Sequence, residues 1–213
     1  SFTMQPSEFV KPAFIVVRAR MVADAQGNPG FPGIRVNIAL YLAVAGLLIL
    51  QPDFGQTALI SMTWLFQFFL AGLPWIWVAG LALAGIAFLG AAYIFLPHVA
   101  SRVDRFIDPA SGDTYQIDTA LNAFRTGGLF GRGPGEGVVK RVLPDAHTDF
   151  IFSVAGEEFG LIACLIIVAL FGFITLRGFA RLLREDDLFV LLAAAGLLTQ
   201  FGLQAVINIG VNL

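Results

Sequence analysis

The stretch LPDAHTDFIFSVAGEEFG (143–160), which continues into LIACLIIVALFGFITL (161–176), decides the class of fold. With Phe159 and Gly160 the second part forms an uncharged, mostly apolar run of 18 residues (159–176), and apolar runs of about 18 or more residues predict membrane-spanning helices. The first part places a polar cluster between Asp145 and Asp149 at the start of this run, and two glutamates, Glu157 and Glu158, inside it. The stretch therefore predicts a membrane helix with carboxylates near one end.

The composition of the whole chain agrees with a membrane protein. Of its 213 residues 57% are hydrophobic and 13% are charged, whereas soluble domains carry roughly 25% charged residues. A net charge of −2 without a basic tract argues against nucleic acid as a partner. The single cysteine, Cys164, excludes an intrachain disulfide. We expect an all-α fold, a polytopic transmembrane helical bundle with a long extracytoplasmic loop between its fourth and fifth spans.

Six apolar segments are the predicted spans of this single membrane domain. They cover about 7–25, 35–50, 54–72, 75–97, 149–176 and 188–213. The polar stretch 98–148 forms the long loop, and RGFARLLREDD (177–187) is expected to be a short charged loop. Basic residues in short loops favour the cytoplasm under the positive-inside rule, which places loop 98–148 outside. The basic residues assigned to the short loops are Arg18, Arg20, Arg35, Arg177, Arg181 and Arg184.

Glu157 and Glu158 are unusual because a charge at the centre of a span costs at least ~2.5–3.5 kcal/mol. In one helix Ser153 and Glu157 would share a face. Gly156 and Gly160 form a pair of small residues that permits close helix packing. Two interpretations remain open: a glutamate that caps or bridges neighbouring helices, which we favour, and a direct role in chemistry.

Amide side chains recur every four residues in the last segment and predict one polar face. Hydrogen bonds between helices are the favoured interpretation of this stripe, and substrate contact is the alternative. The stripe consists of Gln200, Gln204, Asn208 and Asn212. Asp53, in QPDFG (51–55), reads as a helix N-cap, which is compatible with a functional role.

The long loop holds two further patterns. In YQIDTALNAFR (115–125) the apolar residues Ile117, Leu121 and Phe124 predict a helix that lies along the membrane surface. GGLFGRGPGEG (127–137) is a glycine-rich loop, and its backbone N–H groups are candidates to hold a lipid-linked pyrophosphate. A solvated surface loop is the equal alternative.

The aspartate that precedes the fifth span also has two interpretations. Asp149 can cap the helix, where the helix dipole stabilises its charge, or it can act as a base towards a substrate at the membrane interface. His147 is a second titrating group two residues away.

Several motifs occur in the order and spacing of one family. They are QPSEFVK (5–11), QPDFGQTAL (51–59), FIDP (106–109), YQ (115–116), GGLFGRGPGEG (127–137) and LPDAHTDFIFSVAGEEFG (143–160). The chain resembles the SEDS proteins (shape, elongation, division and sporulation) over essentially its whole length. It is closer to the FtsW branch than to RodA, and similar to an alphaproteobacterial type. The resemblance implies a fragment that covers the fourth to ninth spans of the family's fold. Asp145 stands where the family usually has Glu, and Gln56 also departs from its pattern.

The resemblance implies a peptidoglycan glycosyltransferase that polymerises lipid II at the outer face of the cytoplasmic membrane during cell division. Asp149 matches the family's catalytic aspartate. The expected partners are a class B penicillin-binding protein, other divisome proteins, lipid II and membrane lipids. A divalent cation, Mg²⁺ or Mn²⁺, is a candidate cofactor without assigned ligands. The candidate substrate-binding residues are Lys11, Asp53, Arg102, Arg105, Lys140, Arg141 and His147.

Two other functions remain as alternatives. A flippase for lipid-linked cell-wall precursors would use Glu157, Glu158 and the amide stripe to line its path. A non-catalytic division scaffold would need no catalytic Asp149. All three functions place the protein in the bacterial inner membrane as a multi-pass protein, and the division role places it at the septum.

Overall fold

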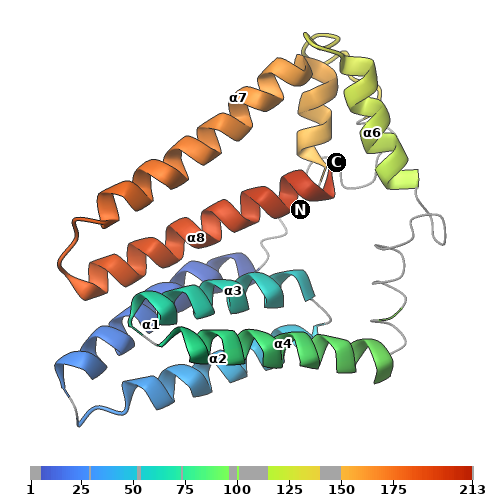
Figure 1. Ribbon diagram of the computed structural model, residues 1–213. Coiled ribbons are helices and arrows are strands. Elements are labelled where there is room, and N and C mark those ends of the chain that lie inside the picture. The colour runs from blue at the N-terminus through green and yellow to red at the C-terminus, as the bar shows by residue number, and fades with distance from the viewer. Residues whose placement is uncertain are drawn as a thin grey trace. The chain divides into compact units, whose positions relative to one another are not determined.

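The computed structural model describes residues 6–28, 30–51, 54–72, 74–95, 100, 115–139 and 150–212. Within these ranges all regular secondary structure is α-helical and no strand occurs, which confirms the predicted all-α class. The described residues contain seven helices (Figure 1). They are α1 (Pro6–Gly27), α2 (Gly33–Leu50), α3 (Phe54–Leu70), α4 (Trp75–Phe95), α6 (Tyr115–Gly127), α7 (Ile151–Leu182) and α8 (Leu188–Val211).

Three of the described helices are long and apolar enough to cross a membrane. They are α2, α7 and α8, the last counted over Leu188–Gly210. The criterion is length and composition alone, so the six-span boundaries remain a prediction. Except at the C-terminal end of α7, the helices begin and end close to the predicted segments.

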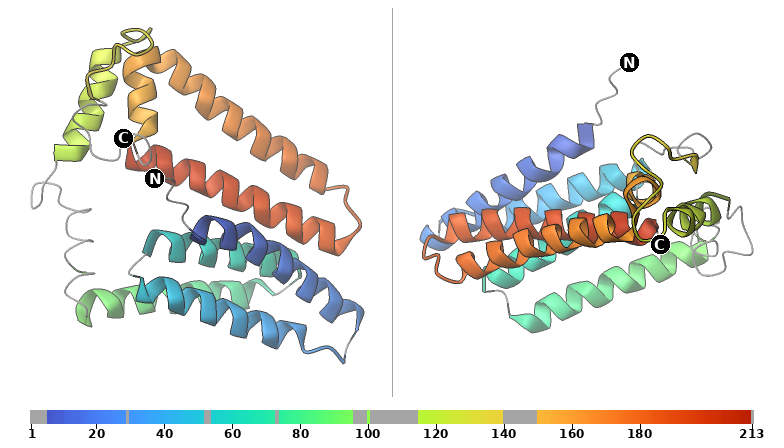
Figure 2. Two further views of the ribbon diagram at one scale, coloured as in Figure 1. Left: turned by 180° about the vertical axis from the view of Figure 1, so that it is seen from behind. Right: turned by 90° about the horizontal axis from the view of Figure 1, so that it is seen from above.

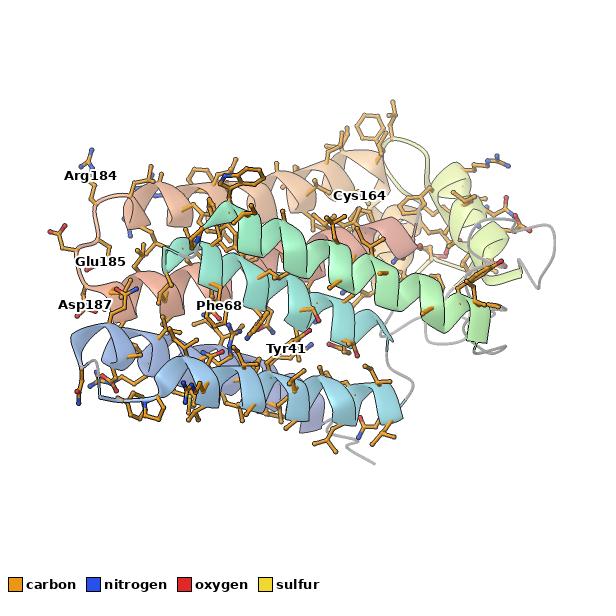
Figure 3. All side chains as sticks on the ribbon, turned by 60° about the horizontal axis from the view of Figure 1, so that its bottom comes forward. Tyr41, Phe68, Cys164, Arg184, Glu185 and Asp187 are labelled. Carbon is orange, nitrogen blue, oxygen red and sulfur yellow. The ribbon has the colours of Figure 1, made fainter. Side chains whose placement is uncertain are left out.

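The expected charged loop after the fifth segment is wrong in its first half, because α7 continues to Leu182. Arg177 and Arg181 therefore lie on a helix, with exposed side chains near its C-terminus, where the helix dipole favours positive charge. The turn that follows carries Arg184, Glu185 and Asp187 (Figure 3). Asp187 begins α8 as an N-cap, because its Oδ1 accepts hydrogen bonds from the backbone N–H groups of Phe189 at 2.8 Å and Val190 at 3.1 Å.

The chain divides into two compact units, and each is described by itself. The first comprises Ser1–Leu83 and Ile174–Leu203, and the second comprises Ala84–Phe173 and Gln204–Leu213. In the first unit α1, α2 and α3 lie side by side in every view (Figures 1 and 2). Their core is aromatic and aliphatic: Phe14, Leu48, Ile60, Trp64 and Phe68. The ring of Tyr41 stacks on that of Trp64, with centroids 4.2 Å apart.

A buried arginine lies inside this three-helix group. Arg18 is 1% exposed, and its guanidinium donates from Nε to Asn37 Oδ1 at 3.1 Å and from Nη2 to the carbonyl of Trp64 at 3.3 Å. The guanidinium carbon also lies 5.0 Å from the centroid of the Phe14 ring. Trp64 Nε1 donates to the same Asn37 oxygen at 3.0 Å. Assigning Arg18 to a short cytoplasmic loop was therefore wrong, because its charge is buried in the bundle.

Candidate functional site

The site forms in the second unit, around a break in α7. Gly160 has φ 81° and ψ 177°, a conformation outside the helical region that only glycine adopts readily. The helix therefore consists of two legs, residues 151–159 and 161–182, that run in different directions (Figure 1). The expectation of one continuous helix in which Gly160 serves close helix packing was wrong.

A glycine-rich segment of residues 127–139, here called the glycine loop, lies directly against this break. A Cβ atom on Gly160 would collide with the backbone of Leu129 and Gly131, and one on Gly131 would collide with the backbone of Glu158. Gly131 itself has φ 79°. Glycine is thus needed on both sides, because the two backbones approach without room for a side chain.

The glycine loop supplies the hydrogen bonds that the break removes from α7. A helix end leaves its last carbonyls and the next helix's first N–H groups without partners, which is costly in a membrane. Here four backbone bonds join the loop to the two legs. They are Arg132 N to Glu157 O at 3.0 Å, Gly133 N to Glu158 O at 3.0 Å, Leu161 N to Gly128 O at 2.9 Å and Ile162 N to Leu129 O at 3.3 Å.

The side-chain carboxylate of Glu157 also binds the glycine loop. The residue is 0% exposed. Its two oxygens accept hydrogen bonds from the backbone N–H groups of Val138 and Val139, both at 3.0 Å. Arg132 Nη1 lies 3.8 Å from Glu157 Oε1. These groups compensate the charge locally, which explains how a glutamate is tolerated in an apolar helix.

Glu158 makes an equivalent contact nearer the surface. Its Oε2 accepts a hydrogen bond from the N–H of Gly135 at 3.0 Å. Both glutamates therefore bind the glycine loop, while the interpretation that one of them caps or bridges neighbouring helices remains a prediction. The loop amides at residues 131, 132, 133, 135, 138 and 139 all donate to protein acceptors. Their use as a phosphate cradle would require the glutamates to be displaced.

α6 packs on the first leg of α7, and its prediction as a helix is confirmed. Ala120, Ala123 and Gly127 are buried in this helix, and the ring of Phe124 lies against Gly156. The face of α6 that packs against α7 is therefore shifted from the predicted one of Ile117, Leu121 and Phe124. It is centred on the small residues Ala120 and Ala123, which let the two helices approach closely. The side chain of Ile117 lies outside the described residues. On the second leg, Cys164 is also buried (Figure 3).

The amide stripe of α8 contributes one clear contact. Asn212 Oδ1 accepts hydrogen bonds from the Ser153 hydroxyl at 2.6 Å and the Ser153 N–H at 3.0 Å. Asn212 Nδ2 donates to the carbonyl of Asn208 at 2.7 Å. The side chain of Gln204 is half-buried and that of Asn208 is exposed. Hydrogen bonding between helices thus accounts for the last member of the stripe.

Most of the predicted substrate-binding residues lie outside the described residues. Lys11 is described, and it is 1% exposed in α1 of the first unit. The catalytic candidate Asp149 lies outside the described residues, two positions before the first residue of α7. The other candidates outside the described residues are Asp53, Arg102, Arg105, Lys140, Arg141 and His147. Their roles remain predictions.

The divalent cation, Mg²⁺ or Mn²⁺, remains a prediction. In the described part of the chain no group of three or more potential metal ligands gathers, and Mg²⁺ is commonly held by one or two carboxylates together with substrate phosphates. The carboxylates of Glu157 and Glu158 are occupied by backbone N–H groups and, for Glu157, by Arg132.

The fold and the broken helix define the class as an α-helical integral membrane protein. A family described as "Cell cycle protein", that of FtsW, RodA and SpoVE, matches residues 1–213. The chain belongs to this family, and to its FtsW type, as the resemblance implied.

Proteins named probable peptidoglycan glycosyltransferase FtsW are similar throughout the chain. The protein of Caulobacter vibrioides is 49% identical over 212 residues, which cover 100% of this chain and 54% of the relative. That of Allochromatium vinosum is 39% identical over 98% of this chain and 55% of the relative. The protein of Legionella pneumophila is 37% identical over a region that covers 82% of this chain and 46% of the relative. The chain thus spans about half the length of the curated relatives that it matches.

Proposed function

We propose that the protein is a peptidoglycan glycosyltransferase that polymerises lipid II at the outer face of the bacterial inner membrane during cell division. The observation that carries the proposal is the FtsW-type sequence, with 49% identity to a relative named for this activity. The hydrogen bonds that hold the N-terminal part of α7 in place also support the proposal. The residue assigned as the base, Asp149, lies two positions before the first residue of a helix that the glycine loop and Asn212 contact.

The proposed chemistry joins two lipid-anchored sugars. Asp149 takes the proton from the 4-hydroxyl of the acceptor GlcNAc while that oxygen bonds to the anomeric carbon of the donor glycan. The bond between this carbon and the pyrophosphate oxygen breaks, and undecaprenyl pyrophosphate leaves with the electron pair. A positioned base contributes typically 10²–10⁴-fold to such a step. The helix dipole at the start of α7 favours the ionised form of a nearby carboxylate.

The leaving pyrophosphate needs positive charge more than it needs a proton. Arg102, Arg105, Lys140 and Arg141 are the proposed source of this charge, and His147, Lys11 and Asp53 are proposed to contact the substrates. A class B penicillin-binding protein is the proposed partner that crosslinks the strands, within a divisome at the septum.

The flippase alternative has less support. A flippase needs polar groups that face a path across the bilayer, but the carboxylates of Glu157 and Glu158 face the glycine loop and are occupied there. The scaffold alternative differs from the proposal only in activity, so an assay separates the two.

The test uses the full-length protein, purified with its class B partner and incubated with labelled lipid II and Mg²⁺ or Mn²⁺. Wild type is expected to produce glycan strands on a gel, and Asp149→Ala is expected to lose at least about 10²-fold in rate. Glu136→Gln, a change in an exposed carboxylate of the glycine loop, is the matched control and should retain activity. Equal strands from wild type and Asp149→Ala would remove Asp149 from catalysis. Absence of strands from wild type, with the partner's transpeptidase active, would favour transport or scaffolding.

A further inference from the structure

Two large apolar side chains stand exposed at the turn of the glycine loop. Leu129 is 58% exposed and Phe130 is 80% exposed, and glycines flank them on both sides. This pair is called the loop tip. Adjacent large apolar side chains on a solvated loop are costly, and such exposure commonly marks a surface that another apolar phase covers.

Hydrogen bonds fix the loop tip to the first turn of the second leg of α7. Leu161 N donates to Gly128 O at 2.9 Å, and Ile162 N donates to Leu129 O at 3.3 Å. The tip therefore has one defined position beside this helix. The side chains of that turn and the next are themselves exposed and apolar: Leu161 46%, Ile162 43%, Leu165 59% and Ile166 63%. The tip and the helix thus share one continuous apolar surface.

The length of the second leg places this surface relative to a bilayer. Residues 161–182 extend over about 33 Å at 1.5 Å per residue, close to the ~30 Å thickness of the hydrocarbon core. The charged, exposed turn with Arg184, Glu185 and Asp187 marks the opposite end of this leg. Because such charges stay outside hydrocarbon, Leu161 lies near the other boundary, and the loop tip lies there with it.

We propose that Leu129 and Phe130 insert into the adjacent leaflet of the membrane and anchor the glycine loop at the hydrocarbon boundary. The occupant of this surface is lipid, because the same surface continues along a helix with the length and composition of a membrane span. Arg132 lies two residues beyond Phe130, and its side chain is 44% exposed. Its guanidinium lies 3.8 Å from the Glu157 carboxylate, so this charge is paired within the protein.

The anchoring is compatible with the backbone on either side of the tip, because several of its polar groups are paired within the protein. The amides at residues 131–133 donate within the protein, and the carbonyls of Gly128 and Leu129 accept from α7. Backbone that is paired in this way is tolerated at membrane depth. Membrane anchoring of the glycine loop does not depend on the glycosyltransferase activity.

Site-directed spin labelling tests the anchor in the full-length protein, reconstituted in phosphatidylglycerol and phosphatidylethanolamine nanodiscs on a cysteine-free background. A nitroxide at Phe130→Cys should collide several-fold more often with oxygen, which concentrates in lipid, than with a water-soluble nickel chelate. Ile166→Cys on the second leg serves as the lipid reference. Glu136→Cys, exposed on the same loop, serves as the water reference and should show the opposite preference. Leu129→Cys repeats the measurement if Phe130→Cys does not fold.

Two results would overturn the inference. A label at the loop tip that prefers the nickel chelate as strongly as the label at Glu136→Cys would place the tip in water. A label that is inaccessible to both reagents would show that protein, either another segment of the full-length chain or a partner, covers the tip in place of lipid.

Discussion

Asn212 caps the N-terminus of α7 from 59 positions away in the sequence: its Oδ1 accepts hydrogen bonds from both the hydroxyl and the backbone N–H of Ser153. This N–H belongs to the first turn of α7, where the helix itself offers no acceptor. Both residues are buried, at 2% and 0% exposure. The end of α8 thus fixes the start of the helix that follows the proposed catalytic Asp149.

Removal of either partner should destabilise the protein, because a buried polar group then loses its hydrogen bond. Asn212→Ala should lower the free energy of unfolding by about 1–3 kcal/mol, and Ser153→Ala by about 1 kcal/mol. The double variant should lose less than the sum, because the two residues share one interaction. Unfolding of the full-length protein in detergent measures these values. Asn208→Ala, an exposed amide of the same helix, is the control, and strictly additive losses would contradict the contact.

Gly160→Ala should disrupt the break in α7. Its φ of 81° costs a side-chain-bearing residue about 1–3 kcal/mol, and the added Cβ would also collide with Leu129 and Gly131. A marked fall in melting temperature is expected. Gly172→Ala, in the second leg with open space around it, should be neutral or slightly stabilising, since alanine favours helix by about 0.5–1 kcal/mol. Equal melting temperatures for both variants would mean that α7 does not need glycine at residue 160.

Arg18→Lys should destabilise the first unit although it keeps the charge. An ammonium lacks the fork that reaches Asn37 and the carbonyl of Trp64 together. The buried charge then loses at least one hydrogen bond, worth about 1.5–3 kcal/mol. Arg20→Lys is the matched control, because the Arg20 side chain is 64% exposed and its pair with Asp24 should be worth less than about 1 kcal/mol. Thermal unfolding in detergent compares the two, and similar shifts would contradict a structural role for Arg18.

The helices of this chain could be predicted because local signals determine them. Apolar runs between breakers such as Asn28, Gly30 and Pro32 predict α1 and α2, and the spacing in residues 115–125 predicts α6. Boundaries were less predictable. The two arginines and the glycine between Arg177 and Leu182 suggest a loop. These residues nevertheless continue α7, because long basic side chains can extend away from an apolar helix.

The candidate site was less predictable because its contacts are distant in sequence and involve the backbone. Glu157 was recognisable as a carboxylate in an apolar run, but its partners, the N–H groups of Val138 and Val139, carry no residue-type signal. From the sequence alone Gly160 cannot be distinguished from a small residue that serves helix packing. Its positive φ, which only the structure shows, identifies it as the break. The position of Arg18 inside the apolar segment 7–25 favours a buried charge over a loop residue.

Glu157 holds the glycine loop against the break in α7, and hydrogen exchange of the full-length protein is the measurement that tests this contact. In Glu157→Gln one of the two amides, Val138 or Val139, faces an NH₂ group and loses its acceptor. A loss of about 1.4 kcal/mol would accelerate exchange of the peptide with these amides about tenfold. Glu136→Gln on the same loop should leave exchange unchanged. Faster exchange in Glu157→Gln alone is the predicted result, whereas unchanged exchange in both variants would contradict the account.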